Sequence, residues 1–184
     1  MMLVGMTRVR VWLVIFCALF CYSCSKRDYE VIPPQIATAP AGNEFEITMR
    51  TGVQPMDWAK ILSGVREGDP KSEYRWTGPE CSFEFRLEQS SNLVFRAEYY
   101  VSDKVLAQTH AQTVILTVND VVQHRILEAA PGIRQWSVPV AADLISKSPS
   151  TRVTLTVRPP YIETNGEQLG ILLHRVGFAR KISE

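Results

Sequence analysis

The sequence predicts an all-β protein, and two observations carry this prediction. Short runs in which apolar and polar residues alternate recur along the chain, separated by Gly, Pro, Asn and Ser, as expected of strands joined by turns. The sequence has no long amphipathic segments between these runs, which a parallel sheet would require. We therefore expect a β-sandwich of about eight antiparallel strands, with a jelly-roll topology and not a closed barrel.

The clearest element is the stretch 113–127, TVILTVNDVVQHRIL. Apolar residues at every second position of its first half share one face, because side chains alternate along a strand. Asn119 and Asp120 follow, and both residue types tolerate the positive φ angles that tight hairpin turns require. We therefore expect two strands joined by a two-residue turn, forming the central hairpin of the domain.

Other strands are predicted by the same alternation and by the turns that bound them. The run 151–158, TRVTLTVR, alternates most regularly and ends at two prolines. The remaining expected strands are 44–51, 81–87, 93–101, 133–138 and 169–178.

Helices are expected to be few and short. The stretch 55–65 begins with a proline and is predicted as a helix, because Trp58, Ile61 and Leu62 would share one helical face. The stretch 139–145 is expected to form a helical turn or an irregular edge.

Residues 1–23 have the layout of a secretory signal. Arg8 and Arg10 form a positive segment, and an uninterrupted apolar run follows at 11–20. A run of about ten residues suits a signal peptide and is too short to span a bilayer as a helix.

The residues around Cys24 point to lipid attachment. Ser23 and Cys24 match the last two positions of the bacterial lipoprotein signal, which this segment resembles, whereas Cys21 and Tyr22 depart from its preferred residues. The resemblance implies that Cys24 becomes the N-terminus and carries fatty-acyl chains such as palmitate. The alternatives are cleavage as an ordinary secreted protein and retention as an uncleaved anchor. Ser25 favours the outer membrane, facing the periplasm, in a Gram-negative cell.

The remainder of the chain divides into a spacer and one domain. Residues 24–43 include Pro33, Pro34 and Pro40 and lack strand or helix periodicity, which predicts a flexible tether. The β-sandwich domain is expected at 44–184.

The charge balance gives no indication of a nucleic-acid partner. The chain has 20 Lys and Arg against 19 Asp and Glu. Removing Arg8 and Arg10 with the leader leaves 18 against 19, a formal charge of −1. Nucleic-acid binding normally requires a strongly basic domain or face, so no nucleic-acid partner is predicted.

The cysteines do not form a disulfide framework. Cys17, Cys21 and Cys24 lie in or beside the leader, and only Cys81 lies in the predicted domain. We expect Cys81 to be a small buried residue on a strand. The alternative is a disulfide with Cys24, which requires that Cys24 is unmodified.

Four segments in a fixed order resemble a known family. They are the aromatic cluster 74–80, the strand 113–119, the strand 151–160 with its two prolines, and the closing segment 169–171. This order resembles galactose-binding-like jelly-roll domains of bacterial envelope proteins, some of them beside or fused to glycan-assembly enzymes. The resemblance covers roughly residues 58–178 and implies a non-catalytic sandwich that often binds carbohydrate.

Aromatic residues near predicted loops are the candidate ligand-binding residues. Trp58, Trp76 and Tyr161 could stack on sugar rings, and Arg75 could bind the hydroxyl groups. The alternative for the two tryptophans is that they close the ends of the sandwich core.

The sequence predicts no catalytic residue, metal site or cofactor. His110, His124 and His174 lack metal-ligand spacing, and no nucleophile motif is present. Surface positions or cross-strand packing are expected for the histidines. Glu73, Glu80 and Glu84 are the one set that could supply a carboxylate pair for glycoside hydrolysis.

These observations predict an envelope lipoprotein that binds carbohydrate or an envelope partner without catalysis. It would be held to the membrane through its N-terminal lipid. Two alternatives remain: a structural or assembly lipoprotein that docks a membrane complex through a sheet edge or face, and a glycoside hydrolase.

Overall fold

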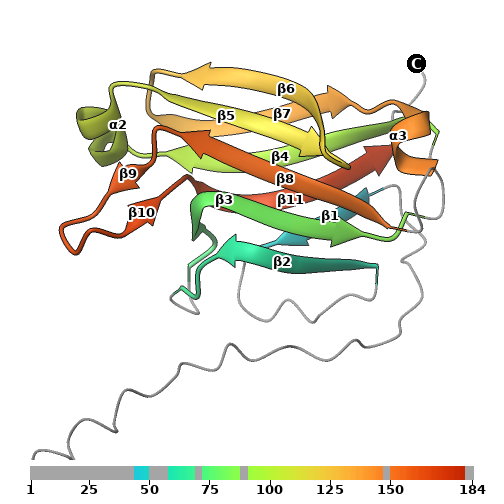
Figure 1. The fold of residues 1–184 in the computed structure, drawn as a ribbon, viewed down its shortest axis with the longest axis horizontal. Helices are drawn as coiled ribbons and strands as arrows, with labels where there is room; N and C mark the ends of the chain where they lie inside the picture. The colour runs from blue at the N-terminus through green and yellow to red at the C-terminus, as the bar shows by residue number, and fades with distance from the viewer. Residues whose placement is uncertain (1–43, 50–57, 69–71, 88–90, 147–149, 181–184) are drawn as a thin grey trace, which may run out of the picture. The chain divides into compact units, whose positions relative to one another are not determined.

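A computed structural model describes residues 44–49, 58–68, 72–87, 91–146 and 150–180 (Figure 1). The predicted leader, Cys24 and the tether lie outside the described residues. No helix among the described residues is long and apolar enough to cross a membrane.

The described chain consists mainly of antiparallel strands. In chain order the elements are β1 (Glu44–Thr48), β2 (Ala59–Val65), β3 (Arg75–Phe85), β4 (Leu93–Val101), α2 (Asp103–Thr109), β5 (Gln112–Val118), β6 (Val121–Glu128), β7 (Gly132–Pro139), α3 (Ala142–Ser146), β8 (Thr151–Arg158), β9 (Tyr161–Ile162), β10 (Gln168–Leu169) and β11 (Leu172–Arg180).

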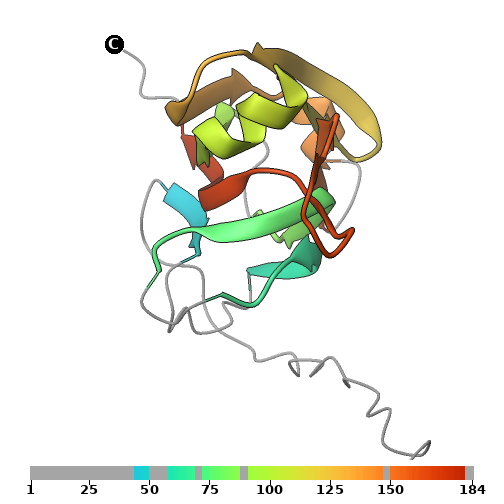
Figure 2. The same cartoon turned by 90° about the vertical axis from the view of Figure 1, so that its left-hand side faces the viewer.

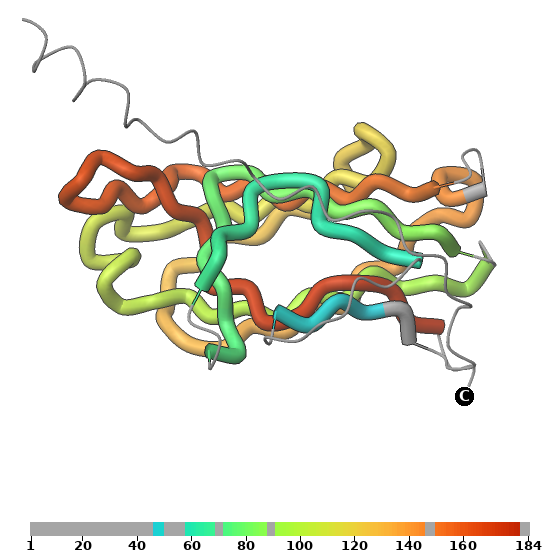
Figure 3. The backbone as a smooth tube through the Cα atoms, turned by 90° about the horizontal axis from the view of Figure 1, so that it is seen from below, coloured from blue at the N-terminus to red at the C-terminus, as the bar shows by residue number. Residues whose placement is uncertain are grey.

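The strands form two packed layers, which Figure 3 shows from below. One layer has the order β2-β3-β8-β5-β6, and the other has the order β1-β11-β4-β7. The start of β3 also pairs with β11, which links the two layers into one continuous sheet. The chain changes layer repeatedly, for example from β3 to β4 and from β4 to β5. The predicted all-β sandwich of jelly-roll type is confirmed.

The core lies between the layers and is built from the apolar residues at alternate strand positions. In β8 every second residue is buried, as its sequence pattern predicts. Phe178 packs edge-on against Phe85 and Phe95, with ring centroids 5.2 and 5.7 Å away. Burying a large apolar side chain contributes about 1.5–3 kcal/mol, so these strands are held mainly by the core. Cys81 is buried, and burial raises the pKa of its thiol to about 12.

The predicted hairpin is present as β5 and β6. Asn119 and Asp120 have φ angles of 46° and 65°, the left-handed conformation that a type I′ turn requires. β5 lies between β6 and β8, as expected of a central strand. β6, however, forms the edge of its layer, so only the first half of the hairpin is central.

The prediction of a helix at 55–65 is wrong for the residues that the structure describes. Residues 59–65 form β2, which pairs with β3 through two irregularities of register. Ile61 is 42% exposed, whereas Trp58 is buried, so the face that the helical pattern suggested does not exist. Pairing with the long strand β3 satisfies the backbone of this segment, and this outweighs a weak local helical preference.

Two short helices complete the fold. α3 confirms the helical turn expected at 139–145, displaced by a few residues. The sequence interpretation missed α2, which begins after Ser102. The Ser102 hydroxyl accepts a hydrogen bond from the Lys104 backbone N–H at 3.3 Å and caps the helix. Figure 2 shows α2 at the same end of the sandwich as the β9–β10 hairpin.

Candidate functional site

The structure places the four residues that the sequence interpretation proposed for ligand binding in three different surroundings. Trp58 is only 5% exposed and belongs to the core, with its ring centroid 6.4 Å from that of Phe85. A sugar therefore cannot reach the ring face without displacing core residues. For Trp58 the packing alternative is the better account.

Trp76 and Tyr161 do lie together, at the end of the sandwich that carries α2. Both belong to a small apolar cluster with Val105 and Leu169. Tyr161 is 7% exposed, and the Lys104 ammonium lies 5.3 Å from its ring centroid. The cluster closes this end of the sandwich and leaves little of the Tyr161 ring for a ligand.

Arg75, at the start of β3, forms a hydrogen bond with the backbone of another segment. Its Nε donates a hydrogen bond to the Met49 carbonyl at 3.0 Å. This contact ties β3 to the residue that follows β1. Part of the guanidinium's hydrogen-bonding capacity is thus used within the fold.

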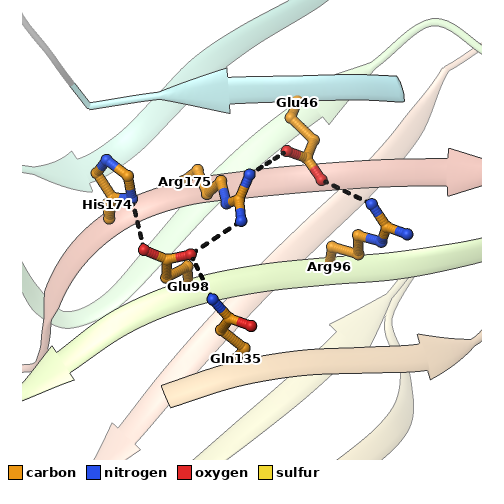
Figure 4. Close-up of polar contacts among 6 residues, drawn as sticks. All are labelled: Glu46, Arg96, Glu98, Gln135, His174 and Arg175. Atoms are coloured by element: carbon orange, nitrogen blue, oxygen red, sulfur yellow. Dashed lines mark hydrogen bonds and ion pairs between the residues drawn. The ribbon is translucent and has the colours of Figure 1, made fainter. Parts of the chain in front are cut away.

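A different group of polar residues gathers on the outer face of the β1-β11-β4-β7 layer (Figure 4). We call this surface the Glu98 face, after the carboxylate that contacts three of the other residues. Its polar residues come from all four strands: Glu46, Arg96, Glu98, Gln135, His174 and Arg175.

Glu98 accepts contacts from three neighbours. His174 Nδ1 lies 2.9 Å from Glu98 Oε1, and Arg175 and Gln135 donate to Glu98 Oε2 at 2.9 and 3.0 Å. His174 and Arg175 are adjacent in sequence, so a regular strand would point them to opposite faces. A bulge between Leu173 and Arg175 breaks the alternation, which allows both side chains to reach the same carboxylate.

A second group of ion pairs lies beside Glu98 on the same face and joins β1, β11 and β4. Gly177 of β11 lies between Arg96 on β4 and Glu46 on β1 in the strand register. Because Gly177 has no side chain, the two charged groups can approach above it, with Arg96 Nη1 3.9 Å from Glu46 Oε1. Arg175 Nη1 lies 3.5 Å from Glu46 Oε2. Since Arg175 also contacts Glu98, it joins the two groups into one network.

Aromatic rings border this network. The Tyr74 ring lies over that of His174, with centroids 5.1 Å apart and planes inclined by 34°. Tyr100 meets Tyr74 edge-on at 6.4 Å. All three rings are half-buried, so each keeps an exposed part beside the charged groups.

The network sets the ionisation of Glu98. Burial acts to raise the pKa of this carboxyl, but the hydrogen bonds from His174 and Arg175 and the positive charge of Arg175 outweigh it, so the pKa lies below the ordinary value of 4.5. Burial raises the pKa of Tyr74, and the charges of Glu98 and Glu73 add to this effect. Near neutral pH the face therefore presents a carboxylate and a neutral tyrosine.

This arrangement suits recognition of a polyol. Sugar rings carry apolar C–H faces that pack on aromatic rings, and hydroxyl groups that bond to planar polar side chains. Glu98, Gln135 and Arg175 are such side chains, and each is held by the others before any ligand arrives. Ordering them costs little on binding, which favours affinity.

Two of the three carboxylates considered for hydrolysis, Glu80 and Glu84, do not form a suitable pair. Glu80 and Glu84 lie on the same face of β3, four residues apart, which corresponds to about 13 Å along a strand. Glycosidases place their two carboxyl groups about 5 to 9.5 Å apart. Glu84 is also engaged by Lys60, with Nζ 2.8 Å from Oε2.

The histidines lie where the sequence interpretation expected them. The His124 ring meets the Trp136 ring edge-on, with centroids 5.5 Å apart, and the two residues belong to strands of different layers. His174 on β11 contacts Glu98 on the neighbouring strand β4. Among the described residues, no group of three or more His, Cys, Asp or Glu side chains could hold a metal ion.

Sequence reasoning missed the Glu98 face because its residues are spread over four strands. One signal was present: Arg96, Glu98 and Tyr100 occupy alternate positions of a predicted strand, opposite to its apolar residues. Polar residues on an outer strand face are usual, however, and only the pairing of the strands shows that they meet Gln135 and His174.

The fold and this face define an antiparallel β-sandwich with a mixed polar and aromatic surface. No protein-family model matches the chain, and no curated protein matches it. Among solved structures, the chain is similar to the CBM36-1 domain of a multidomain xylanase from the hindgut metagenome of Trinervitermes trinervoides. The similarity covers 73% of this chain and 97% of that domain, with 10% identity and a TM-score of 0.38. At these values it carries no information on the ligand of this chain.

Proposed function

We propose that this protein is a non-catalytic binding module that recognises carbohydrate on the Glu98 face. One observation carries the proposal. The exposed parts of the Tyr74, Tyr100 and His174 rings border polar side chains that already hold one another in place. A stacking surface beside oriented donors and acceptors is a combination that suits the apolar face and the hydroxyl groups of a sugar ring.

A binding screen tests the proposal. The probes are xylan, galactomannan, polygalacturonate and soluble peptidoglycan fragments, with affinity measured by titration calorimetry or affinity electrophoresis. We expect at least one probe to bind, and Tyr74→Ala or Tyr100→Ala to weaken that binding about five- to tenfold through loss of ring contact.

Two further sets of variants locate the site. Glu84→Gln changes a carboxylate on the opposite layer that also has an ion-pair partner, so it serves as the matched control and should bind as the wild type does. Trp76→Ala and Tyr161→Ala probe the end that the sequence interpretation favoured. If these two abolish binding while Tyr74→Ala does not, the site lies at the α2 end and not on the Glu98 face.

We further propose that lipid on Cys24 anchors the protein in the cell envelope. The apolar run, Ser23 and the proline-containing tether support this assignment. In a Gram-negative cell the expected location is the outer membrane, facing the periplasm. Labelled fatty acid should enter the wild type and not Cys24→Ala, and equal labelling of the two would contradict the assignment.

A second function, docking of an envelope protein, is favoured by the edge strands β6 and β7. Leu127 is 66% exposed and Ile133 is 56% exposed, and both lie near the short connection between these strands. Exposed apolar residues on unpaired edges suit a protein partner. Crosslinking in membranes should then recover a partner from the wild type and less of it from Leu127→Ser. Recovery of the monomer alone would contradict this second function.

A further inference from the structure

The contact between His174 and Glu98 fixes where the hydrogen of the imidazole ring lies. An ionised carboxylate can only accept hydrogen bonds. His174 Nδ1 lies 2.9 Å from Glu98 Oε1, so Nδ1 must carry the hydrogen and donate it. A neutral His174 therefore has no hydrogen on Nε2, which is left with an available lone pair.

Glu98 is held in the ionised form that this argument requires. Arg175 and Gln135 donate to its other oxygen, Oε2, so both carboxylate oxygens accept hydrogen bonds from the protein. Their arrangement favours the charged form of the carboxyl, in agreement with the lowered pKa of Glu98.

The Nε2 atom is presented toward the outside of this network. Figure 4 shows it on the far side of the imidazole ring from Glu98. The part of the chain that the structure describes supplies no hydrogen-bond partner to Nε2, and the His174 side chain is 24% exposed. The centroid of the Tyr74 ring lies 5.1 Å from the centroid of the imidazole ring. A bare acceptor thus stands beside an aromatic ring.

We infer that His174 Nε2 accepts a hydrogen bond from a hydroxyl group of the ligand, whose apolar face packs on Tyr74. Glu98 acts as the positioning residue, because it selects the tautomer that leaves Nε2 free to accept. This inference rests on the proposed carbohydrate-binding function and specifies it: the sugar must place a hydroxyl donor at this point. A sugar carboxylate, which can only accept, does not fit there.

Nitrogen NMR of the full chain, labelled with ¹⁵N at histidine, tests the tautomer directly. We expect His174 to show a protonated Nδ1 and a bare Nε2. Adding the probe that binds in the screen above should shift the Nε2 resonance toward that of a hydrogen-bonded nitrogen, with Nδ1 little changed. A hydrogen on Nε2, or binding without a shift of Nε2, would overturn the inference.

Variants supply a second measurement. His174→Phe keeps a ring beside Tyr74 but removes the acceptor, and we expect binding about three- to tenfold weaker. His124→Phe is the matched control, because it makes the same replacement away from the Glu98 face and should leave affinity unchanged. Thermal unfolding checks that both variants are folded.

The outcomes separate the inference from the function it rests on. If a probe binds and His174→Phe binds it as tightly as the wild type, the role of His174 is refuted while carbohydrate binding stands. If neither xylan, galactomannan, polygalacturonate nor the peptidoglycan fragments bind the wild type, the proposed function and this inference fall together.

Discussion

Asn119 connects the tip of the β5–β6 hairpin to two other segments. Its Nδ2 donates to the Leu144 carbonyl at 2.6 Å, and its Oδ1 accepts from the Arg152 backbone N–H at 2.8 Å. Asn119→Asp keeps the acceptor but places a negatively charged oxygen against a carbonyl. We expect this change to lower the free energy of unfolding by about 1–3 kcal/mol, measured by urea denaturation.

The adjacent turn residue provides the control for this prediction. Asp120 has a similar φ angle of 65° and is exposed. Asp120→Asn should therefore change the free energy of unfolding by less than about 0.5 kcal/mol. Equal destabilisation by the two substitutions would mean that the Asn119 side-chain contacts contribute little.

The ionisation of Glu98 predicts how stability depends on pH. Because its folded-state pKa lies below 4.5, the unfolded chain takes up a proton at higher pH than the folded one. The stabilisation from the Glu98 carboxylate is complete above its unfolded pKa and is lost as pH falls through the folded pKa. The stability difference between the wild type and Glu98→Gln should therefore shrink between about pH 5 and about pH 3.

Urea denaturation at several pH values measures this difference. Thr156→Ala, on the other layer, replaces a residue that does not titrate and should differ from the wild type by the same amount at every pH. A wild-type advantage over Glu98→Gln that grows as pH falls would contradict the sign of the shift.

Among the elements, the junction of β10 and β11 is tightly confined. A Cβ atom at Gly170 would meet the Gly78 carbonyl oxygen at 2.4 Å and Thr77 Oγ1 at 2.5 Å. The backbone of β3 would have to move, so we expect Gly170→Ala to destabilise the fold by more than about 2 kcal/mol, as other overpacking substitutions do. Thermal or urea unfolding measures the loss.

Gly166, in the turn between β9 and β10, is the control that distinguishes the cost of crowding from the cost of backbone strain. Its φ is +84°, and a Cβ atom there would meet nothing within 4 Å. Gly166→Ala should cost only about 1–2 kcal/mol, from the left-handed conformation alone. A smaller loss for Gly170→Ala than for Gly166→Ala would show that β3 can move aside.

Strands were predicted correctly where a regular alternation of apolar and polar residues coincided with a clear turn or stop. The β5–β6 hairpin and β8 combine regular alternation with a defined turn or stop, and both are present. β2 was misjudged because an edge strand buries only part of one face, so its apolar spacing also fits a helix. α2 was missed because a seven-residue helix that buries only Val105 leaves almost no periodic pattern.

The candidate site was less accessible to prediction than the fold. The Glu98 face depends on which strands are neighbours and on the bulge in β11, and single-sequence patterns reveal neither. Trp58 and Tyr161 attracted attention as aromatics near loops, yet both are buried. Large aromatic residues serve the core more often than the surface, and only the packing distinguishes the two roles.

At the scale of the whole sandwich, β3 joins the two layers. Arg75 and Trp76 pair with β11 in one layer, whereas residues 80–85 pair with β8 in the other. Tyr74 lies just before the point where β3 enters the first layer. The aromatic border of the Glu98 face and the core of the opposite layer are therefore positioned by one continuous segment.

The placement of β1 has a mechanical consequence if lipid on Cys24 anchors the protein, as proposed above. Glu44 lies opposite Ala179, and β1 has a single neighbouring strand in the described chain, β11. Tension between the N-terminal side of Glu44 and the end of β11 would break the backbone hydrogen bonds between β1 and β11 one after another. Glu46 would separate from Arg96 and Arg175 as β1 peeled away. We expect stretching by optical tweezers through these two points to release β1 before the remaining strands, so that load applied at the N-terminal side reaches the Glu98 face first.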